Sequence, residues 1–145
     1  MTVQTLTQAT PSKSNLLRRS LQGDGLFEVI VGVSLIVRAK PLASLSGVEM
    51  SAILVGIGIG MVLYGAWLFR IATQQPINHR AALTAASLNA AWVVGMMPIL
   101  LAGWLPLTSA GWWAVALITD MVAVFAILQF YHYCEPLFNN RITGI

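Results

Sequence analysis

Charged side chains are scarce in this chain. Aspartate, glutamate, lysine and arginine make up 9% of its 145 residues, whereas average soluble domains carry about 25% charge. Hydrophobic residues account for 57% of the chain, and the mean hydropathy is +0.77. This composition argues against a water-soluble fold. The length leaves room for about four membrane-spanning helices and for no additional soluble domain.

Cysteine and the known catalytic motifs are also missing or rare. The single cysteine, Cys134, excludes an internal disulfide. The chain contains no hydrolase elbow, phosphate loop, nucleotide fingerprint or zinc-protease helix. The net charge of +3 comes from residues at the ends of apolar runs, not from one basic face. We therefore expect neither an enzyme nor a nucleic-acid-binding protein, and we expect no cofactor.

One long uncharged run dominates the sequence. Residues 50–69, MSAILVGIGIGMVLYGAWLF, lie between Glu49 and Arg70 without a charge. A helix of this length spans about 30 Å, which is the thickness of the hydrocarbon core of a bilayer. Inside lipid a helix satisfies its own backbone hydrogen bonds, so the glycines of this run do not prevent a helix. The run predicts a membrane-spanning helix over residues 50–71.

Three further segments have the length and apolar content of a membrane span. Between Arg80 and Asp120 no residue is charged, and the glycines and proline of residues 103–111 give a break. The predicted fold is therefore an all-α transmembrane bundle of four helices, over residues 16–39, 50–71, 80–102 and 111–133. We expect residues 1–14 to be a disordered cytoplasmic tail, residues 41–48 to be a turn, and residues 136–145 to be a short cytoplasmic tail.

The basic residues predict the orientation of the helices. Lysine and arginine are enriched in the cytoplasmic segments of membrane proteins. With both termini in the cytoplasm, six basic residues lie inside and two outside: Lys13, Arg18, Arg19, Arg70, Arg80 and Arg141 against Arg38 and Lys40. The sequence thus predicts a protein of a bacterial-type inner membrane with both termini cytoplasmic.

Ionisable residues within the predicted spans are candidate functional residues, because charge is costly inside lipid. The candidates are Glu28, Asn89, Asp120 and Arg38, with Asp24 and Gln129 nearby in the spans. We expect Glu28 and Asn89, at similar depths, to form a hydrogen bond between two helices, and Arg38 to neutralise Asp120. In one interpretation, these pairs only fix the register of the helices. In another, Glu28 exchanges protons. A third alternative places Glu28 at the membrane surface.

The plan of four helices with an acid, Glu28, in the first of them resembles the small multidrug resistance exporters, which carry one acidic residue in their first helix. The resemblance covers the general plan and the position of Glu28. It implies that the acid binds drug and proton alternately within an antiparallel dimer. This chain differs from that family in its long N-terminal segment, its additional Asp120 and its strong charge bias. Such a bias fixes one orientation and argues against dual insertion.

Small residues four apart predict close helix packing, because van der Waals contact holds helices together in lipid. One predicted ridge is Ala52, Gly56 and Gly60. The third span carries two ridges on different sides, and we expect both to be used inside the chain: Ala82, Ala86 and Ala90 on one side, and Ser87, Ala91 and Gly95 on the other.

His79 and His132 lie at the cytoplasmic ends of the third and fourth spans, with Cys134 and Glu135 close by. A weak metal site is geometrically allowed there, but the spacing matches no ligand signature. Three functions follow. The first is a non-enzymatic accessory or structural component that contacts the bilayer, other membrane proteins or itself. The second is a proton-coupled exporter or channel acting as an oligomer through Glu28. The third is a metal or cofactor holder at the two histidines.

Overall fold

The computed structural model describes residues 13–142, with side chains placed for residues 15–131. Within this range the chain forms five helices. They are α1 (Lys13–Val37), α2 (Ala39–Ser46), α3 (Ser51–Thr73), α4 (His79–Ala102) and α5 (Ser109–Ile142). All except α2 are long and apolar enough to span a membrane. This confirms the prediction of an all-helical fold with four long apolar helices.

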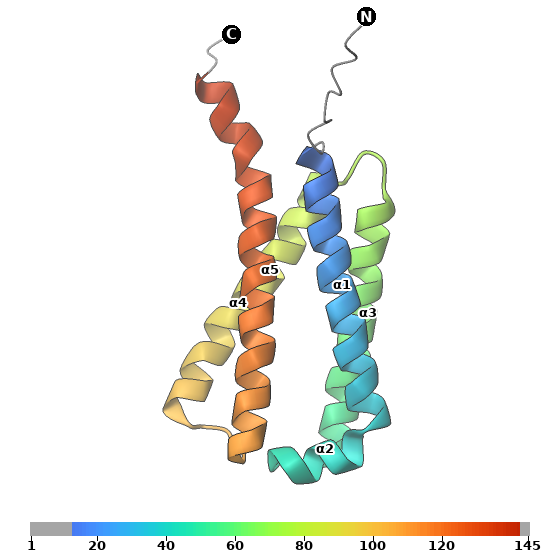
Figure 1. Ribbon diagram of the computed structural model, residues 1–145, viewed down its shortest axis with the longest axis vertical. Coiled ribbons are helices and arrows are strands. Elements are labelled where there is room, and N and C mark those ends of the chain that lie inside the picture. The colour runs from blue at the N-terminus through green and yellow to red at the C-terminus, as the bar shows by residue number, and fades with distance from the viewer. Residues whose placement is uncertain (1–12, 143–145) are drawn as a thin grey trace, which may run out of the picture.

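The long helices run alternately up and down, and α2 lies across one end (Figure 1). We call this the α2 end. The opposite end, with the start of α1, the loop from α3 to α4 and the later part of α5, is called the loop end. Antiparallel connection places Arg18, Arg19, Arg70 and Arg80 toward the loop end, and Arg38 and Lys40 at the α2 end.

Glycines allow α1 and α3 to lie side by side with their backbones in contact. A Cβ atom added to Gly65 would lie 2.7 Å from the carbonyl oxygen of Gly25, and one added to Gly58 would lie 2.6 Å from that of Gly32. On each helix the two glycines are two turns apart, so they lie on one face. A larger residue at any of these positions would force the two helices apart.

The predicted ridge of Ala52, Gly56 and Gly60 is not used inside the chain. All three residues are exposed, and a Cβ atom added to Gly56 or Gly60 would meet no atom within 4 Å. α3 carries small residues on more than one face. The contact with α1 uses the face of Gly58 and Gly65, and the ridge lies on a different face.

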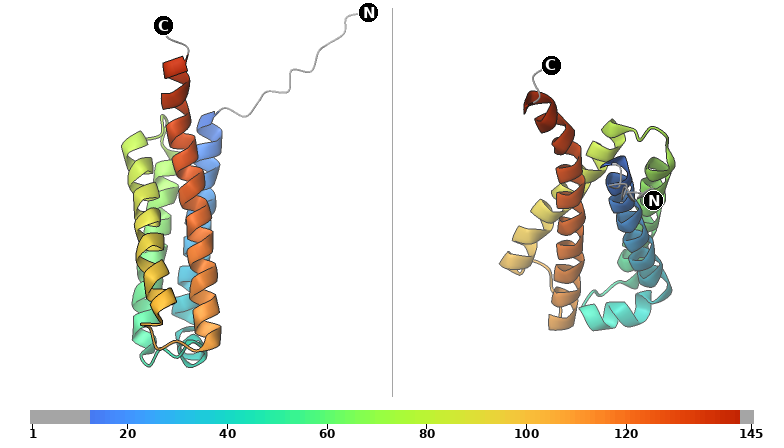
Figure 2. Two further views of the ribbon diagram at one scale, coloured as in Figure 1. Left: turned by 90° about the vertical axis from the view of Figure 1, so that its left-hand side faces the viewer. Right: turned by 45° about the horizontal axis from the view of Figure 1, so that its top comes forward.

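The two predicted ridges of α4 have different outcomes. Ala82 and Ala86 are buried and Ala90 is half-buried, so this ridge faces the bundle as expected. Ser87, Ala91 and Gly95 are exposed, so the expectation that both ridges are used inside the chain is wrong. α4 packs mainly along α5, and toward the α2 end it leaves α1 and α3 (Figures 1 and 2). Because α5 is the main neighbour of α4, packing inside the chain needs only one of the two ridges of α4.

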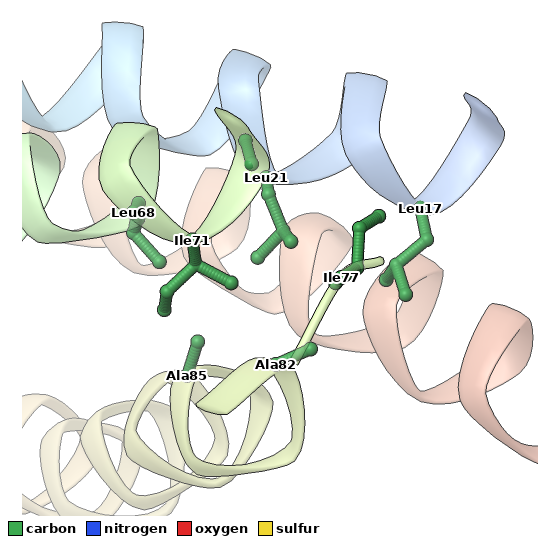
Figure 3. Packing of buried hydrophobic residues seen from close by; sticks show 8 residues of the cluster. Leu17, Leu21, Leu68, Ile71, Ile77, Ala82 and Ala85 are labelled. Carbon is green, nitrogen blue, oxygen red and sulfur yellow. The ribbon is translucent and has the colours of Figure 1, made fainter. Parts of the chain in front are cut away.

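The main hydrophobic core lies at the loop end, where α1, α3 and α4 come together. Figure 3 shows side chains of α1, α3, α4 and the loop before α4 pointing toward one another. The cluster consists of Leu17, Leu21, Leu68, Ile71, Ala72, Ile77, Ala82 and Ala85. Asn78 caps the start of α4 here, since its Oδ1 accepts hydrogen bonds from the backbone N–H groups of Arg80 at 3.1 Å and Ala81 at 3.3 Å.

The segment predicted as a turn over residues 41–48 is mostly helix α2. Pro41 occupies the first turn of α2, where a proline removes no helical hydrogen bond. The helix ends at Gly47, whose φ of 83° suits glycine. Thr108 joins α2 to the start of α5: its backbone N–H donates to the Ser46 carbonyl at 3.0 Å, and its hydroxyl donates to the Leu45 carbonyl.

The long helices begin and end within three residues of the predicted spans, except for α5. α5 continues through Pro136 to Ile142, although a non-helical tail was expected from residue 136. Pro98 also lies inside a helix, α4. Prolines are tolerated in such helices because neighbouring groups satisfy the freed carbonyls. Lys13 and Ser14 belong to α1, and the rest of the predicted N-terminal tail, residues 1–12, lies outside the described residues.

Candidate functional site: a buried polar cluster

Four polar side chains, one from each long helix, meet inside the bundle. They are Asp24 of α1, Tyr64 of α3, Asn89 of α4 and Gln129 of α5. Asp24, Gln129 and Asn89 are 0%, 1% and 3% exposed. The first candidate span begins at Asn15, and Asp24 lies about 14 Å further along the helix axis. We call these four residues the polar cluster.

Asp24 is the acceptor at the centre of the polar cluster. Its Oδ2 accepts a hydrogen bond from Nδ2 of Asn89 at 2.6 Å and another from Nε2 of Gln129 at 2.8 Å. Hydrogen bonds to a carboxyl group are stronger than those between neutral groups when the carboxyl is ionised. One carboxyl oxygen of α1 therefore holds α4 and α5 in place.

Both ends of the Asn89 side-chain amide take part in the polar cluster. Besides its bond to Asp24, its Nδ2 lies 3.5 Å from Oε1 of Gln129. Its Oδ1 lies 2.9 Å from the hydroxyl of Tyr64, which is also 3.1 Å from the carbonyl oxygen of Ala85. The hydroxyl has one proton and donates it to one of these two oxygens at a time. Asn89 thus connects α4 to α1, α3 and α5.

Two carboxyl groups, one in and one beside the polar cluster, have oxygen atoms without a partner among the described residues. Oδ1 of Asp24 is buried and forms no hydrogen bond to any described residue. Glu28 lies one turn further along α1, is 6% exposed, and forms no hydrogen bond or ion pair within the described part of the chain. The contact between α1 and α5 beside them is apolar, since the rings of Phe27 and Phe125 lie 6.0 Å apart.

The expected hydrogen bond between Glu28 and Asn89 does not form. Asn89 bonds to Asp24, one turn closer to the loop end, because α1 places Asp24 at the level of Asn89. Asp120 and Arg38 are both exposed, and no ion pair joins them among the described residues. Their predicted pairing fails because Asp120 points away from the core, whereas the adjacent Thr119 is buried.

Sequence reasoning underrated two members of the polar cluster. The spacing of four residues places Asp24 and Glu28 on one face of α1, but it does not show that Asp24, and not Glu28, accepts the hydrogen bonds of the amides. Tyr64 was not considered, because a tyrosine within an apolar run resembles any other aromatic residue. The signal was the combination of an acid, an asparagine and a glutamine in three different spans.

The metal prediction at the histidines is not tested by the geometry. His79 begins α4, whereas the side chains of His132, Cys134 and Glu135 lie outside the described residues. Among described side chains, no three histidine, cysteine or acidic residues gather in a group that can hold a metal ion. The site at this end stays a prediction.

Two open depressions mark the surface of the described chain. One, of about 410 Å³, lies at the α2 end and includes Lys40, Ser44 and Glu49. The other, of about 520 Å³, lies between α4 and α5 and has an apolar lining that includes Val94, Ala123 and Ile127. Neither is lined by Asp24 or Glu28.

Comparison of the chain with models of protein families, with curated proteins and with solved structures finds no match. The polar cluster and the exposed helix faces therefore carry the functional argument.

Proposed function

We propose that this chain is a small non-catalytic membrane protein that works as an accessory component of a larger membrane assembly. In this proposal it spans a bacterial-type inner membrane four times, with both termini in the cytoplasm. The observation that carries the proposal is the exposed ridge of Ala52, Gly56 and Gly60 on α3, which no other part of the described chain covers.

The contrast between two faces of α3 supports this proposal. Gly58 and Gly65 are buried in contact with the backbone of α1, whereas Gly56 and Gly60 would accept a Cβ atom without meeting any neighbour. In lipid, close backbone approach is a main source of attraction between helices. A second small-residue face offers the same attraction to a helix of another protein.

The internal polar groups favour the accessory role over transport. The exporter alternative needs a water-accessible path to Glu28, and neither of the two depressions described above reaches this residue. The amide groups of Asn89 and Gln129 are occupied in joining the helices of this one chain. Polar groups used in this way stabilise a bundle and fix its register.

A ridge variant tests the proposal. The tagged full chain would be purified in mild detergent from its native membrane, and the integral membrane proteins retained with it would be identified and quantified. We expect the double variant Gly56→Leu/Gly60→Leu to lose at least tenfold of a retained partner, since leucine side chains keep another backbone away.

Ala66→Leu is the matched control, because Ala66 is also an exposed small residue of α3 but lies away from the ridge. It should retain the partner at the level of the unchanged chain. Equal retention by the ridge variant and the control would contradict the accessory role through this face. Retention of only a second copy of the chain would replace it with self-association.

A further inference from the structure

The carboxyl group of Asp24 is only half satisfied by the polar cluster. Oδ2 accepts hydrogen bonds from two amide groups, whereas Oδ1 is buried without a partner among the described residues. Leaving a buried polar atom unpaired is costly, and leaving a buried charge unpaired is more costly still. The geometry therefore leaves a place for a bound group at Oδ1.

No counter-charge from the described residues meets this carboxyl group. No lysine, arginine or histidine side chain forms an ion pair with Asp24 or Glu28 in that part of the chain. From the other helices, Asp24 faces the side of α3 that carries Tyr64. It also faces the uncharged amide groups of Asn89 and Gln129. Arg18, on α1 itself, donates instead to the carbonyl oxygen of Gln74 at 3.1 Å.

Glu28 supplies a second carboxyl group near the first. It lies one turn along the same face of α1, is buried, and has no hydrogen-bond partner among the described residues. Carboxyl groups four residues apart on a helix have Cβ atoms about 5–6 Å apart. Two like charges at this separation in an apolar setting repel each other strongly, so at least one of them must be neutralised.

We infer that Asp24 and Glu28 form a proton-binding site inside the bundle. A proton binds Oδ1 of Asp24 and forms an O–H group, and the carboxyl group of Glu28 accepts a hydrogen bond from it. The pair then carries one negative charge less, and no bond other than this O–H forms or breaks. The amides of Asn89 and Gln129 occupy Oδ2 and so direct the proton to Oδ1.

A sodium ion is the competing ligand. It requires several oxygen ligands around a space large enough for the ion, whereas Oδ2 of Asp24 already accepts two hydrogen bonds from amide groups. A proton needs no such space. The inference does not depend on the accessory role, because it concerns an internal site that a partner on α3 would not touch.

Infrared spectroscopy of the full chain in liposomes tests this site directly. A protonated carboxyl group gives a C=O stretching band separate from the bands of carboxylates and amides. The chain contains only two aspartates, Asp24 and Asp120, so labelling with carboxyl-¹³C aspartate reports on very few groups. At neutral pH we expect labelling to shift a protonated-carboxyl band in the Asp120→Asn variant, whose only remaining aspartate is Asp24.

Two further variants define the pair. Asp24→Asn should abolish the label-sensitive band completely, and Glu28→Gln should shift the frequency of that band because the hydrogen-bond acceptor changes. The labelled Asp120→Asn protein gives a result even if Asp24→Asn fails to fold. The proposal is overturned if labelling shifts no protonated-carboxyl band at neutral pH, or if sodium at constant pH removes the band.

Discussion

At the scale of single residues, Asn89 joins α4 to each of the other long helices. Its Nδ2 donates to Asp24 at 2.6 Å and lies 3.5 Å from Oε1 of Gln129, and its Oδ1 is 2.9 Å from the hydroxyl of Tyr64. The side chain is 3% exposed, so water does not replace these partners. Removing the amide leaves groups on three helices with fewer hydrogen bonds.

We therefore predict that Asn89→Ala lowers the free energy of unfolding by about 1–2 kcal/mol, the upper range for interhelical hydrogen bonds in membranes. The measurement is a denaturation titration with sodium dodecyl sulfate in mixed micelles. Ser87→Ala is the control, because Ser87 is exposed on the same helix. If the two variants unfold at the same denaturant fraction, the polar cluster does not hold the helices together.

The members of the polar cluster were largely visible in the sequence, but their pairing was not. An acid pair in the first span and amides in the third and fourth spans follow from counting residues between charges. The partner of Asn89 depends on the axial offset and rotation of α1, which the contacts at Gly25 and Gly32 set. A shift of one turn exchanges Glu28 for Asp24, and no local pattern excludes that shift.

At the scale of elements, glycines bring the backbones of α1 and α3 into contact. The carbonyl oxygens of Gly32 and Gly25 occupy the positions that side chains on Gly58 and Gly65 would need. Helices that touch in this way gain van der Waals contact along both backbones. Other glycines of α3 contact nothing, so substitutions at packed and unpacked glycines can be compared within one helix.

Gly58→Ala and Gly60→Ala should therefore have different effects. The new Cβ atom at residue 58 would lie 2.6 Å from the Gly32 carbonyl oxygen, so we expect a loss of about 1–3 kcal/mol in unfolding free energy from overpacking. At residue 60 the space is open, and the change should stay within about 0.5 kcal/mol. Thermal or detergent unfolding of the two variants side by side measures this. Similar losses at both positions would show that the α1–α3 contact is not the tight one.

Predictions for elements succeeded where one physical requirement dominated. Long apolar segments with few charges favour helices, and four such segments gave α1, α3, α4 and α5. The turn predicted over residues 41–48 is mostly helix because Pro41 lies in the first turn of α2, where a proline is favourable. The expectation that both small-residue ridges of α4 pack inside the chain failed because the spacing of small residues describes a face but does not identify its neighbour.

At the scale of the whole molecule, two pairs of helices form the bundle. α1 packs on α3 and α4 packs on α5, and the pairs are joined mainly by the core at the loop end, the polar cluster and the contact of α1 with α5. Toward the α2 end, α4 leaves α3 (Figure 2). The roles proposed for the polar cluster and for the exposed ridge require that these four helices cross a membrane with the loop end in the cytoplasm.

Cysteine labelling tests this central claim most directly. In a Cys134→Ser background, single cysteines would replace Gln75 in the loop between α3 and α4 and Leu105 in the loop between α4 and α5, both exposed. On intact cells, a membrane-impermeant thiol reagent should label Leu105→Cys, and it should label Gln75→Cys only after the membrane is permeabilised. Labelling of Gln75→Cys in intact cells, or equal labelling of both positions, would contradict the proposed membrane topology.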